Sequence, residues 1–249
     1  MPCLAGPRKI EARTPPRCDT QTQRAGGLAA APRHALTVFM RITKHEHACL
    51  RLELEDRQLI IDPGGFTLPL EDLHGLVAVV ITHEHADHWT PQQLAHIRAQ
   101  VPDVPMYGTA GVAAAGADVT VVSPGDTVTA GPFTLTFHGG THSVIHESIP
   151  VVQNVGVLVN DTFYYPGDSY SLPGDAPIAM LAAPVGAPWL KIGEAMDFVL
   201  AARPHRAFAT HDMTLSRIGL DMHRARLAWA AEQGGGEFVT LDPGDAVEV

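Results

Sequence analysis

The stretch that decides the fold is residues 83–88, which read His-Glu-His-Ala-Asp-His. The chain has 14 histidines among 249 residues, yet chance places the pattern His-x-His-x-Asp-His somewhere in it with a probability only on the order of 0.003. Residues 76–82 (LVAVVIT) precede it and form a continuous apolar, β-branched run, typical of a strand buried on both faces. The pattern therefore begins where a buried strand is predicted to end.

The residue types and the spacing of this motif suit metal binding. Alternate residues at a strand end point the same way, so His83 and His85 can bind one metal ion. Asp87 and His88, on the following turn, can face a neighbouring ion. Imidazole and carboxylate ligands suit zinc, iron or manganese. The motif predicts a metal centre in preference to a surface loop that merely carries several histidines.

A complete metal centre needs further ligands from strands that are distant in sequence. Three residues of suitable type follow predicted strands, namely His142, Asp168 and His211. Alternating and apolar runs predict strands at residues 48–54, 57–62, 76–82, 105–108, 119–122, 127–130, 133–137, 155–159, 162–165, 179–183 and 206–210. Helices are predicted at residues 91–100, 192–202 and 216–233. Two β-rich halves, each with helices, predict two packed sheets with helices outside.

Residues 1–39 differ in composition from the rest of the chain. They are rich in arginine and proline and carry a charge of +4, which leaves −14 on residues 40–249. Three interpretations are open: a flexible tail, a targeting peptide, or translated upstream sequence before a start at Met40. We favour the last. The expected domain organisation is a disordered or spurious extension over 1–39 and one domain over 40–249.

Composition narrows the classes of function. A hydrophobic fraction of 45% is enough for a sizeable core, and a net charge of −10 repels polyanions, so we expect no nucleic-acid partner. The sequence has no run of about 18 apolar residues and no signal peptide, which predicts a cytoplasmic protein without a membrane partner. Cys3, Cys18 and Cys49 are unclustered, as expected of reduced thiols.

In order along the chain, these motifs resemble those of the metallo-β-lactamase fold superfamily. The matching segments are residues 59–64 (LIIDPG), the 83–88 motif, His142 in GGTHS, Asp168 in PGDS and His211 in ATHD. Within the superfamily the chain looks most like bacterial metal-dependent hydrolases related to L-ascorbate-6-phosphate lactonase. The resemblance covers about residues 40–249 and implies an α/β fold, a four-layer αββα sandwich of two mixed β-sheets with helices outside.

The resemblance also implies two divalent metal ions at the rim between the sheets, with Zn²⁺ favoured and Mn²⁺ or Fe²⁺ as alternatives. The implied ligands are His83, His85 and His142 for the first ion, Asp87, His88 and His211 for the second, and Asp168 as the bridge. His146 is the alternative to His142. We favour His142, which lies next to Ser143 just beyond the strand, and expect His146 to contact the substrate or line its pocket.

Other residues are expected to support the centre from outside it. Asp62, in the matching LIIDPG motif, would orient a ligand imidazole without touching metal. Seven histidines lack a motif and are expected on the surface or behind the ligands: His45, His47, His74, His96, His138, His205 and His223. Trp89, Trp189 and Lys191 could contact a substrate, and the lone ammonium would suit an anionic group. A position in the core is equally open for the tryptophans, and a solvated position at the start of a helix is equally open for the lysine.

Two such metal ions, about 3.5–4 Å apart, share a water and lower its pKa toward 7. The bridging hydroxide would attack a carbonyl or phosphoryl centre, while Asp87 orients it or passes its proton to the leaving group. We therefore expect a dinuclear hydrolase of a small ester, lactone or phosphoester. The alternatives are an iron-dependent oxidoreductase of the dioxygenase type and a nuclease on the same fold. The charge of −14 on residues 40–249 argues against the nuclease. Diiron flavoproteins of this fold resemble the motif but have a glutamate at the position of His85, which argues against a diiron oxidoreductase.

Overall fold

Two seven-stranded β-sheets, packed face to face, form the centre of the protein in a computed structural model that describes residues 39–249. Across the first sheet lie β14 (Ala246–Glu248), β1 (Arg41–Lys44), β2 (Leu50–Leu54), β3 (Arg57–Ile61), β4 (Leu76–Ile81), β5 (Met106–Gly108) and β6 (Thr120–Val121). Across the second lie β13 (Glu237–Phe238), β12 (Arg206–Thr210), β11 (Met180–Pro184), β10 (Phe163–Tyr165), β9 (Gln153–Val159), β8 (Phe133–Thr141) and β7 (Thr127–Ala130). The interpretations of segment 1–39 concern residues outside the described ones, apart from Phe39.

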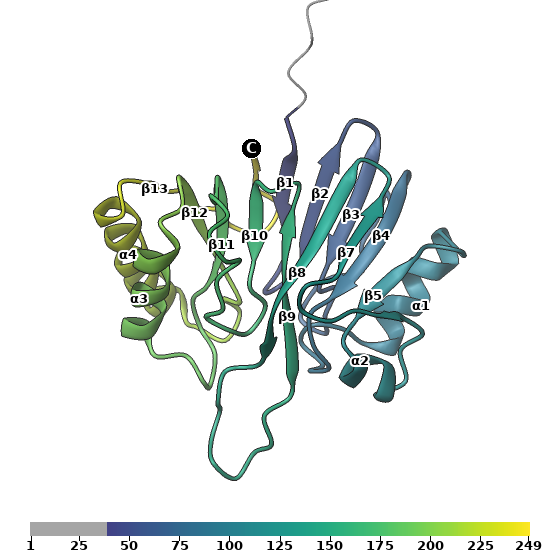
Figure 1. Cartoon of the computed structure of the whole chain (residues 1–249), viewed down its shortest axis with the longest axis horizontal. Helices are drawn as coiled ribbons and strands as arrows, with labels where there is room; N and C mark the ends of the chain where they lie inside the picture. Colours follow the sequence, from purple (N-terminus) through teal and green to yellow (C-terminus); the bar gives the residue numbers. More distant parts are fainter. Residues whose placement is uncertain (1–38) are drawn as a thin grey trace, which may run out of the picture. The chain divides into compact units, whose positions relative to one another are not determined.

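The helices cover the outer faces of the two sheets (Figure 1). The helices α1 (Pro91–Gln100) and α2 (Ala110–Ala114) lie on the first sheet, and α3 (Ile192–Ala202) and α4 (Arg217–Gln233) on the second. The predicted four-layer αββα sandwich is therefore confirmed. Among the described residues, every helix is too short or too polar to cross a lipid bilayer.

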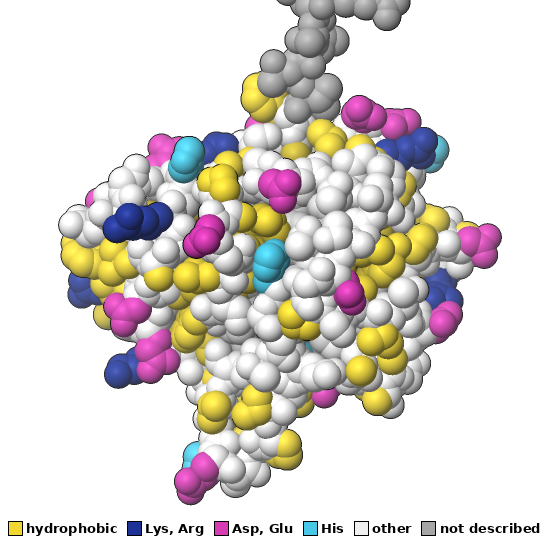
Figure 2. Space-filling view, in the orientation of Figure 1, with side chains coloured by type: hydrophobic (Ala, Val, Ile, Leu, Met, Phe, Trp, Pro, Cys, Tyr) yellow, Lys and Arg dark blue, Asp and Glu magenta, His cyan; other side chains and the backbone are white. Residues whose placement is uncertain are grey.

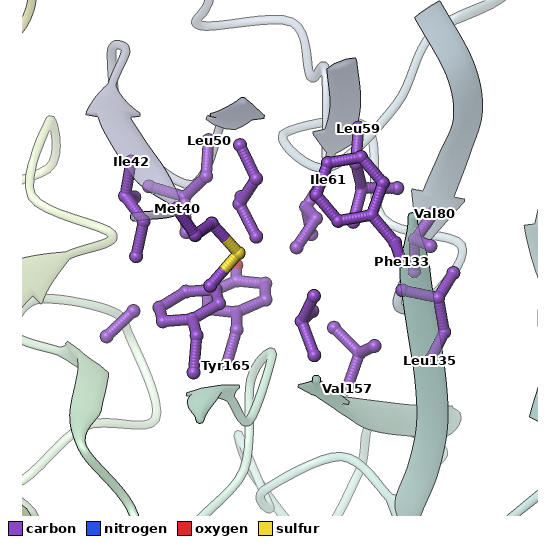
Figure 3. Packing of buried hydrophobic residues seen from close by; sticks show 14 of the residues in the cluster. Met40, Ile42, Leu50, Leu59, Ile61, Val80, Phe133, Leu135, Val157 and Tyr165 are labelled. Carbon is purple, nitrogen blue, oxygen red and sulfur yellow. The ribbon is translucent and has the colours of Figure 1, made fainter. Parts of the chain in front are cut away.

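Strand periodicity explains the layers. In β4, Ala78 and Val80 point into the core between the sheets, whereas Val79 and Ile81 point into the cluster under α1. Because both faces of β4 are covered, its sequence is apolar throughout. Figure 3 shows the core between the sheets, where aliphatic side chains of the first sheet meet those of the second.

Local signals set the helix ends. Thr90 is the N-cap of α1, and its side-chain oxygen accepts a hydrogen bond from the Gln93 N–H at 3.1 Å. Ser216 caps α4 in the same way, so that helix begins at Arg217, one residue later than predicted. The elements that the sequence analysis missed are short ones: β1, β13, β14 and α2 span two to five residues each.

The strand directions bring the ends of distant strands to one edge. Strands β10, β11 and β12 run parallel to one another, and β8 runs parallel to β10 because both are antiparallel to β9. The loops after β8, β10 and β12 therefore leave the second sheet at the same edge, where residues 142–152 project beyond the sheets (Figures 1 and 2). The fold thus collects His142, Asp168 and His211 in one place, next to the loop after β4.

A fully buried lysine joins β1 to the loop after β12. Lys44 Nζ lies 2.9 Å from Asp212 Oδ2 and donates a hydrogen bond to the His45 carbonyl at 3.1 Å. Arg224 on α4 lies 3.6 Å from the same Asp212 oxygen. Because Asp212 directly follows His211, this ion cluster fixes the loop that carries His211.

We predict that Lys44→Met lowers the free energy of unfolding by about 3 kcal/mol, because it leaves the buried Asp212 carboxylate with only the more distant Arg224. Urea denaturation of the metal-free protein measures the change. Arg41→Met is the matched control, since Arg41 lies on the same strand but its side chain is 57% exposed and 3.6 Å from Glu53. The control should change the free energy by less than about 1 kcal/mol, and equal effects of the two variants would contradict the prediction.

Candidate metal centre

The loop of residues 83–88 is held in place by the turn that follows β3. A Cβ atom at Gly64 would lie 1.7 Å from the carbonyl oxygen of Asp87, so only glycine allows this close approach. The Gly65 N–H donates a hydrogen bond to the Ala86 carbonyl at 2.8 Å. The Pro-Gly-Gly turn therefore positions the histidine-rich loop against the end of the first sheet.

Three histidines from two loops form one cluster. His83 Nε2 lies 3.1 Å from His85 Nδ1. The ring centroid of His142 lies 4.8 Å from that of His83 and 4.8 Å from that of His85. One ring nitrogen of each histidine lies within 4.8 Å of the others, which is the spacing of three ligands around one metal ion.

Asp168 connects this cluster to a second one. Its Oδ2 lies 3.3 Å from His142 Nε2 and 3.1 Å from His211 Nε2, and its Oδ1 lies 3.3 Å from His88 Nε2. Asp87 Oδ2 completes the second cluster at 3.3 Å from His211 Nε2. The structure therefore brings all seven candidate ligands together, with Asp168 between two groups of nitrogen atoms.

Hydrogen bonds behind the centre fix which nitrogen of each imidazole carries the proton. Asp62 is fully buried and accepts hydrogen bonds from the Thr82 N–H (2.8 Å), the Thr82 hydroxyl (2.7 Å) and the Tyr165 hydroxyl (3.0 Å). It also accepts from His88 Nδ1 at 2.7 Å. Because the Thr82 hydroxyl donates its hydrogen to Asp62, the Thr82 oxygen accepts a hydrogen bond from His83 Nδ1 at 3.0 Å. Both histidines therefore turn Nε2 toward the centre.

The other two buried histidines follow the same rule. His142 Nδ1 donates to the Ser143 carbonyl, and His211 Nδ1 donates to the Gly186 carbonyl at 2.6 Å. Four buried polar atoms then face the centre without a hydrogen-bond partner: Nε2 of His88, His142 and His211, and Oδ1 of Asp168. Unpaired buried polar atoms are costly, and converging imidazole nitrogens and a carboxylate oxygen are what a metal ion requires. The residues therefore fit a metal ion.

The electrostatics of the centre favour a cation as well. Burial by itself raises the pKa of Asp168, but His211 and His88 hold it well below its usual range, so the carboxylate stays ionised. Burial lowers the pKa of His211, yet Asp168 and Asp87 raise it overall to about 9. Without metal, the carboxylates thus draw a proton onto His211, which marks a place where positive charge is stabilised.

His47 lies behind the candidate ligands, which is one of the two positions that the sequence left open for it. It is fully buried, and its ring centroid lies 3.9 Å from that of His211. Its Nδ1 accepts a hydrogen bond from the Met213 N–H at 3.2 Å, so the neutral ring carries its hydrogen on Nε2. Nε2 therefore donates to Asp87 Oδ2, 3.2 Å away, and offers no lone pair to a metal ion. His47 orients Asp87.

The residues expected to contact substrate lie in different environments. Trp89 is buried in the cluster under α1, and its indole N–H donates to the Glu84 carbonyl at 3.2 Å, so it occupies the core position, one of the two that the sequence left open. The Trp189 N–H donates to Asp168 Oδ2 at 2.9 Å and orients that carboxylate. Lys191 is exposed at the N-cap of α3.

His146 lies apart from the two clusters. It is exposed in the loop between β8 and β9, and its Nδ1 accepts a hydrogen bond from the Ser148 N–H at 3.1 Å. Six of the seven histidines without a motif are exposed or half-buried: His45, His74, His96, His138, His205 and His223. His47 differs from these six only in its tertiary contacts, because a lone His-x-His after a short strand carries no ligand signature in the sequence.

Comparison with known proteins identifies the family. The family described as the β-lactamase superfamily domain matches residues 41–211, and the chain belongs to this superfamily. Protein Rv0786c of Mycobacterium tuberculosis is 34% identical over 194 residues, which cover 76% of this chain and 91% of that protein. The UPF0173 metal-dependent hydrolase mll0680 of Mesorhizobium japonicum is 32% identical over 121 residues, 42% of this chain and 48% of that protein. Among solved structures, Igni18, a metallo hydrolase from Ignicoccus hospitalis, superposes with a TM-score of 0.64 at 16% identity, covering 85% of this chain and 98% of that one.

The two candidates for the third ligand can be separated by metal content. We predict that His142→Ala loses one metal ion per chain after dialysis, because it removes a buried nitrogen that has no other partner. His146→Ala should retain the full metal content, since His146 Nδ1 is occupied by Ser148 and the ring lies outside both clusters. Elemental analysis of the dialysed proteins measures the outcome. Loss of metal from His146→Ala alone would reverse the assignment.

Proposed function

We propose that this metal-dependent hydrolase of the β-lactamase superfamily binds two divalent metal ions, with Zn²⁺ favoured, and hydrolyses a small ester, lactone or phosphoester. The proposal rests above all on the four buried polar atoms of His88, His142, His211 and Asp168 that converge without a partner. Unpaired atoms on both sides of the Asp168 carboxylate support two ions rather than one.

The two clusters suggest how the ligands divide. His83, His85 and His142 would hold the first ion. Asp87, His88 and His211 would hold the second, and Asp168 would bridge them, since its two oxygens lie 3.1–3.3 Å from nitrogens of both groups. When bound, two such ions supply a water that is deprotonated near neutral pH and a Lewis acid for the substrate oxygen.

The carboxylates of the centre differ in whether they can take part in proton transfer. Three carboxylates lie in or behind it, and only Asp87 reaches solvent, with 25% of its side chain exposed against 3% for Asp168 and 0% for Asp62. Asp87 is therefore the carboxylate that a proton from solvent can reach, although His211 and His47 outweigh the effect of burial and hold its pKa well below the usual range. The His47 N–H holds Asp87 Oδ2 in position, and Trp189 does the same for Asp168 Oδ2. Asp62 takes no part in proton transfer, because four donors already occupy its oxygens.

The proposed function is tested by metal stoichiometry and turnover measured on one sample. We expect two Zn²⁺ per chain, and hydrolysis in a panel of a nitrophenyl ester, a γ-lactone and bis-nitrophenyl phosphate. The metal-depleted protein is the control, and its activity should return on addition of Zn²⁺. A single ion per chain would contradict the dinuclear centre, and failure to hydrolyse any member of the panel would contradict the reaction class.

For Asp87 we predict that Asp87→Asn lowers turnover by about 10² to 10⁴, the range typical of a lost general acid or base. Asparagine keeps the size of the side chain and can still meet His211, but it carries no charge and accepts no proton. The ion held by His83, His85 and His142 should remain bound, while the other binds more weakly. Turnover near the wild-type value with excess metal supplied would leave Asp87 with a positional role only.

A further inference from the structure

Exposed apolar side chains concentrate in the loops that carry or adjoin the candidate ligands. The loops that carry or adjoin the candidate ligands, here called the site loops, are residues 45–49, 62–75, 82–90, 142–152, 166–179, 185–191 and 211–216. Seven of the twelve large apolar side chains that are exposed among the described residues lie in them. Isolated apolar residues on a surface need no explanation, but their gathering around one site marks a place where apolar material binds.

Three of these side chains surround the turn that carries His47. The Phe66 ring lies 4.9 Å from the His47 ring and is 50% exposed. Leu68 is 69% exposed, and its N–H donates to the carboxylate of Glu46, the residue before His47. Met213 is 51% exposed, and its N–H donates to His47 itself. Because His47 contacts Asp87, the Phe66 side chain adjoins the proposed second metal position, and the backbone of Leu68 and Met213 is hydrogen-bonded to the same turn.

A second apolar group lies next to the first cluster, in the loop between β8 and β9 that begins with His142. Val144 follows the candidate ligand His142 by two residues and is 61% exposed, and Ile149 and Val151 are exposed further along the same loop. Figure 2 shows apolar surface on this projecting part of the molecule. The loop begins at the metal centre, because the Ser143 N–H donates to the Asp168 carbonyl at 2.8 Å.

The charges of the site loops disfavour an anionic group on the part of the substrate that lies beyond the metal ions. Together the loops contain one Lys or Arg, Lys191, against ten Asp and Glu. Three further cations come near the loop of His211, but Lys44 and Arg224 are buried against Asp212, and Arg217, the residue after the loop, is paired with Asp221 and Asp242. A substrate group beyond the metal ions would therefore meet carboxylates and apolar side chains, and it would lack the cationic side chains that bind phosphate groups.

From these two observations we propose that the substrate is an uncharged ester or lactone with an apolar chain, which lies against Phe66, Leu68 and Met213 or against the Val144 loop. This inference rests on the proposed hydrolase function and narrows its substrate class. Each methylene moved out of water contributes roughly a fourfold gain in binding when fully buried, and less at a half-open surface. An apolar chain thus binds here, while a phosphate-bearing substrate gains nothing from the loops.

The test compares nitrophenyl acetate, butyrate and octanoate with bis-nitrophenyl phosphate, using the Zn²⁺-loaded protein. We expect kcat/KM to rise at least about tenfold from acetate to octanoate and to be lowest for the phosphodiester. Leu68→Ser and Val144→Ser, one in each apolar group, remove apolar surface without touching a candidate ligand. At least one should raise the KM for nitrophenyl octanoate several-fold, and by a larger factor than it raises the KM for nitrophenyl acetate. Ile218→Ser on α4, where Ile218 is 75% exposed, is the matched control and should change neither.

A binding measurement separates recognition from turnover. Hexanamide is uncharged and carries no ester, and calorimetry should show that the protein binds it more tightly than acetamide with or without Zn²⁺. If the protein hydrolyses nitrophenyl acetate but kcat/KM does not rise with chain length, the apolar-chain proposal is overturned and the hydrolase function still stands. A clear preference for the phosphodiester would overturn the uncharged substrate. Inactivity on all four compounds would count against this inference and against the proposed function together.

Discussion

The buried carboxylate of Asp62 is the point on which the metal centre depends. It follows β3, and it accepts hydrogen bonds from Thr82 after β4, from His88 in the motif loop and from Tyr165 on β10 of the opposite sheet. A carboxylate without water is stable only when donors surround it, so these four hydrogen bonds must form together. Asp62 thereby locks the two sheets and the orientation of His83 and His88 into one arrangement.

The same logic separates ligands from supporting residues. His83, His88, His142 and His211 each give Nδ1–H to an oxygen acceptor and keep Nε2 for the centre. His47 does the reverse, because a backbone N–H occupies its Nδ1 and leaves it as a donor to Asp87. We therefore propose that an imidazole close to the centre acts as a ligand or as a support according to what its distant nitrogen contacts. Proximity alone would have grouped His47 with Asp87 and His211 as a ligand.

The surroundings of the centre carry information that the ligands do not. Members of one superfamily share the strand ends that hold the metal, while the loops beyond them select the substrate. In this chain those loops are apolar and acidic, and the buried cations Lys44 and Arg224 hold Asp212 rather than facing the site. The substrate class that we propose rests on this charge pattern, as the proposed reaction rests on the candidate metal ligands.

Much of the fold could be predicted from the sequence, because the signals are local. The apolar run 76–81 needs two covered faces, Thr90-Pro91 starts a helix, and the spacing within residues 83–88 is a metal-binding pattern wherever it occurs at a strand end. Short elements such as β1 and β14 were missed, since three or four residues carry little periodicity. Trp89 and Trp189 look alike in sequence, yet one packs under α1 and the other orients Asp168. Only the tertiary structure decides such cases, and the role of His47, because a hydrogen bond between residues 40 or 166 positions apart leaves no pattern in the sequence.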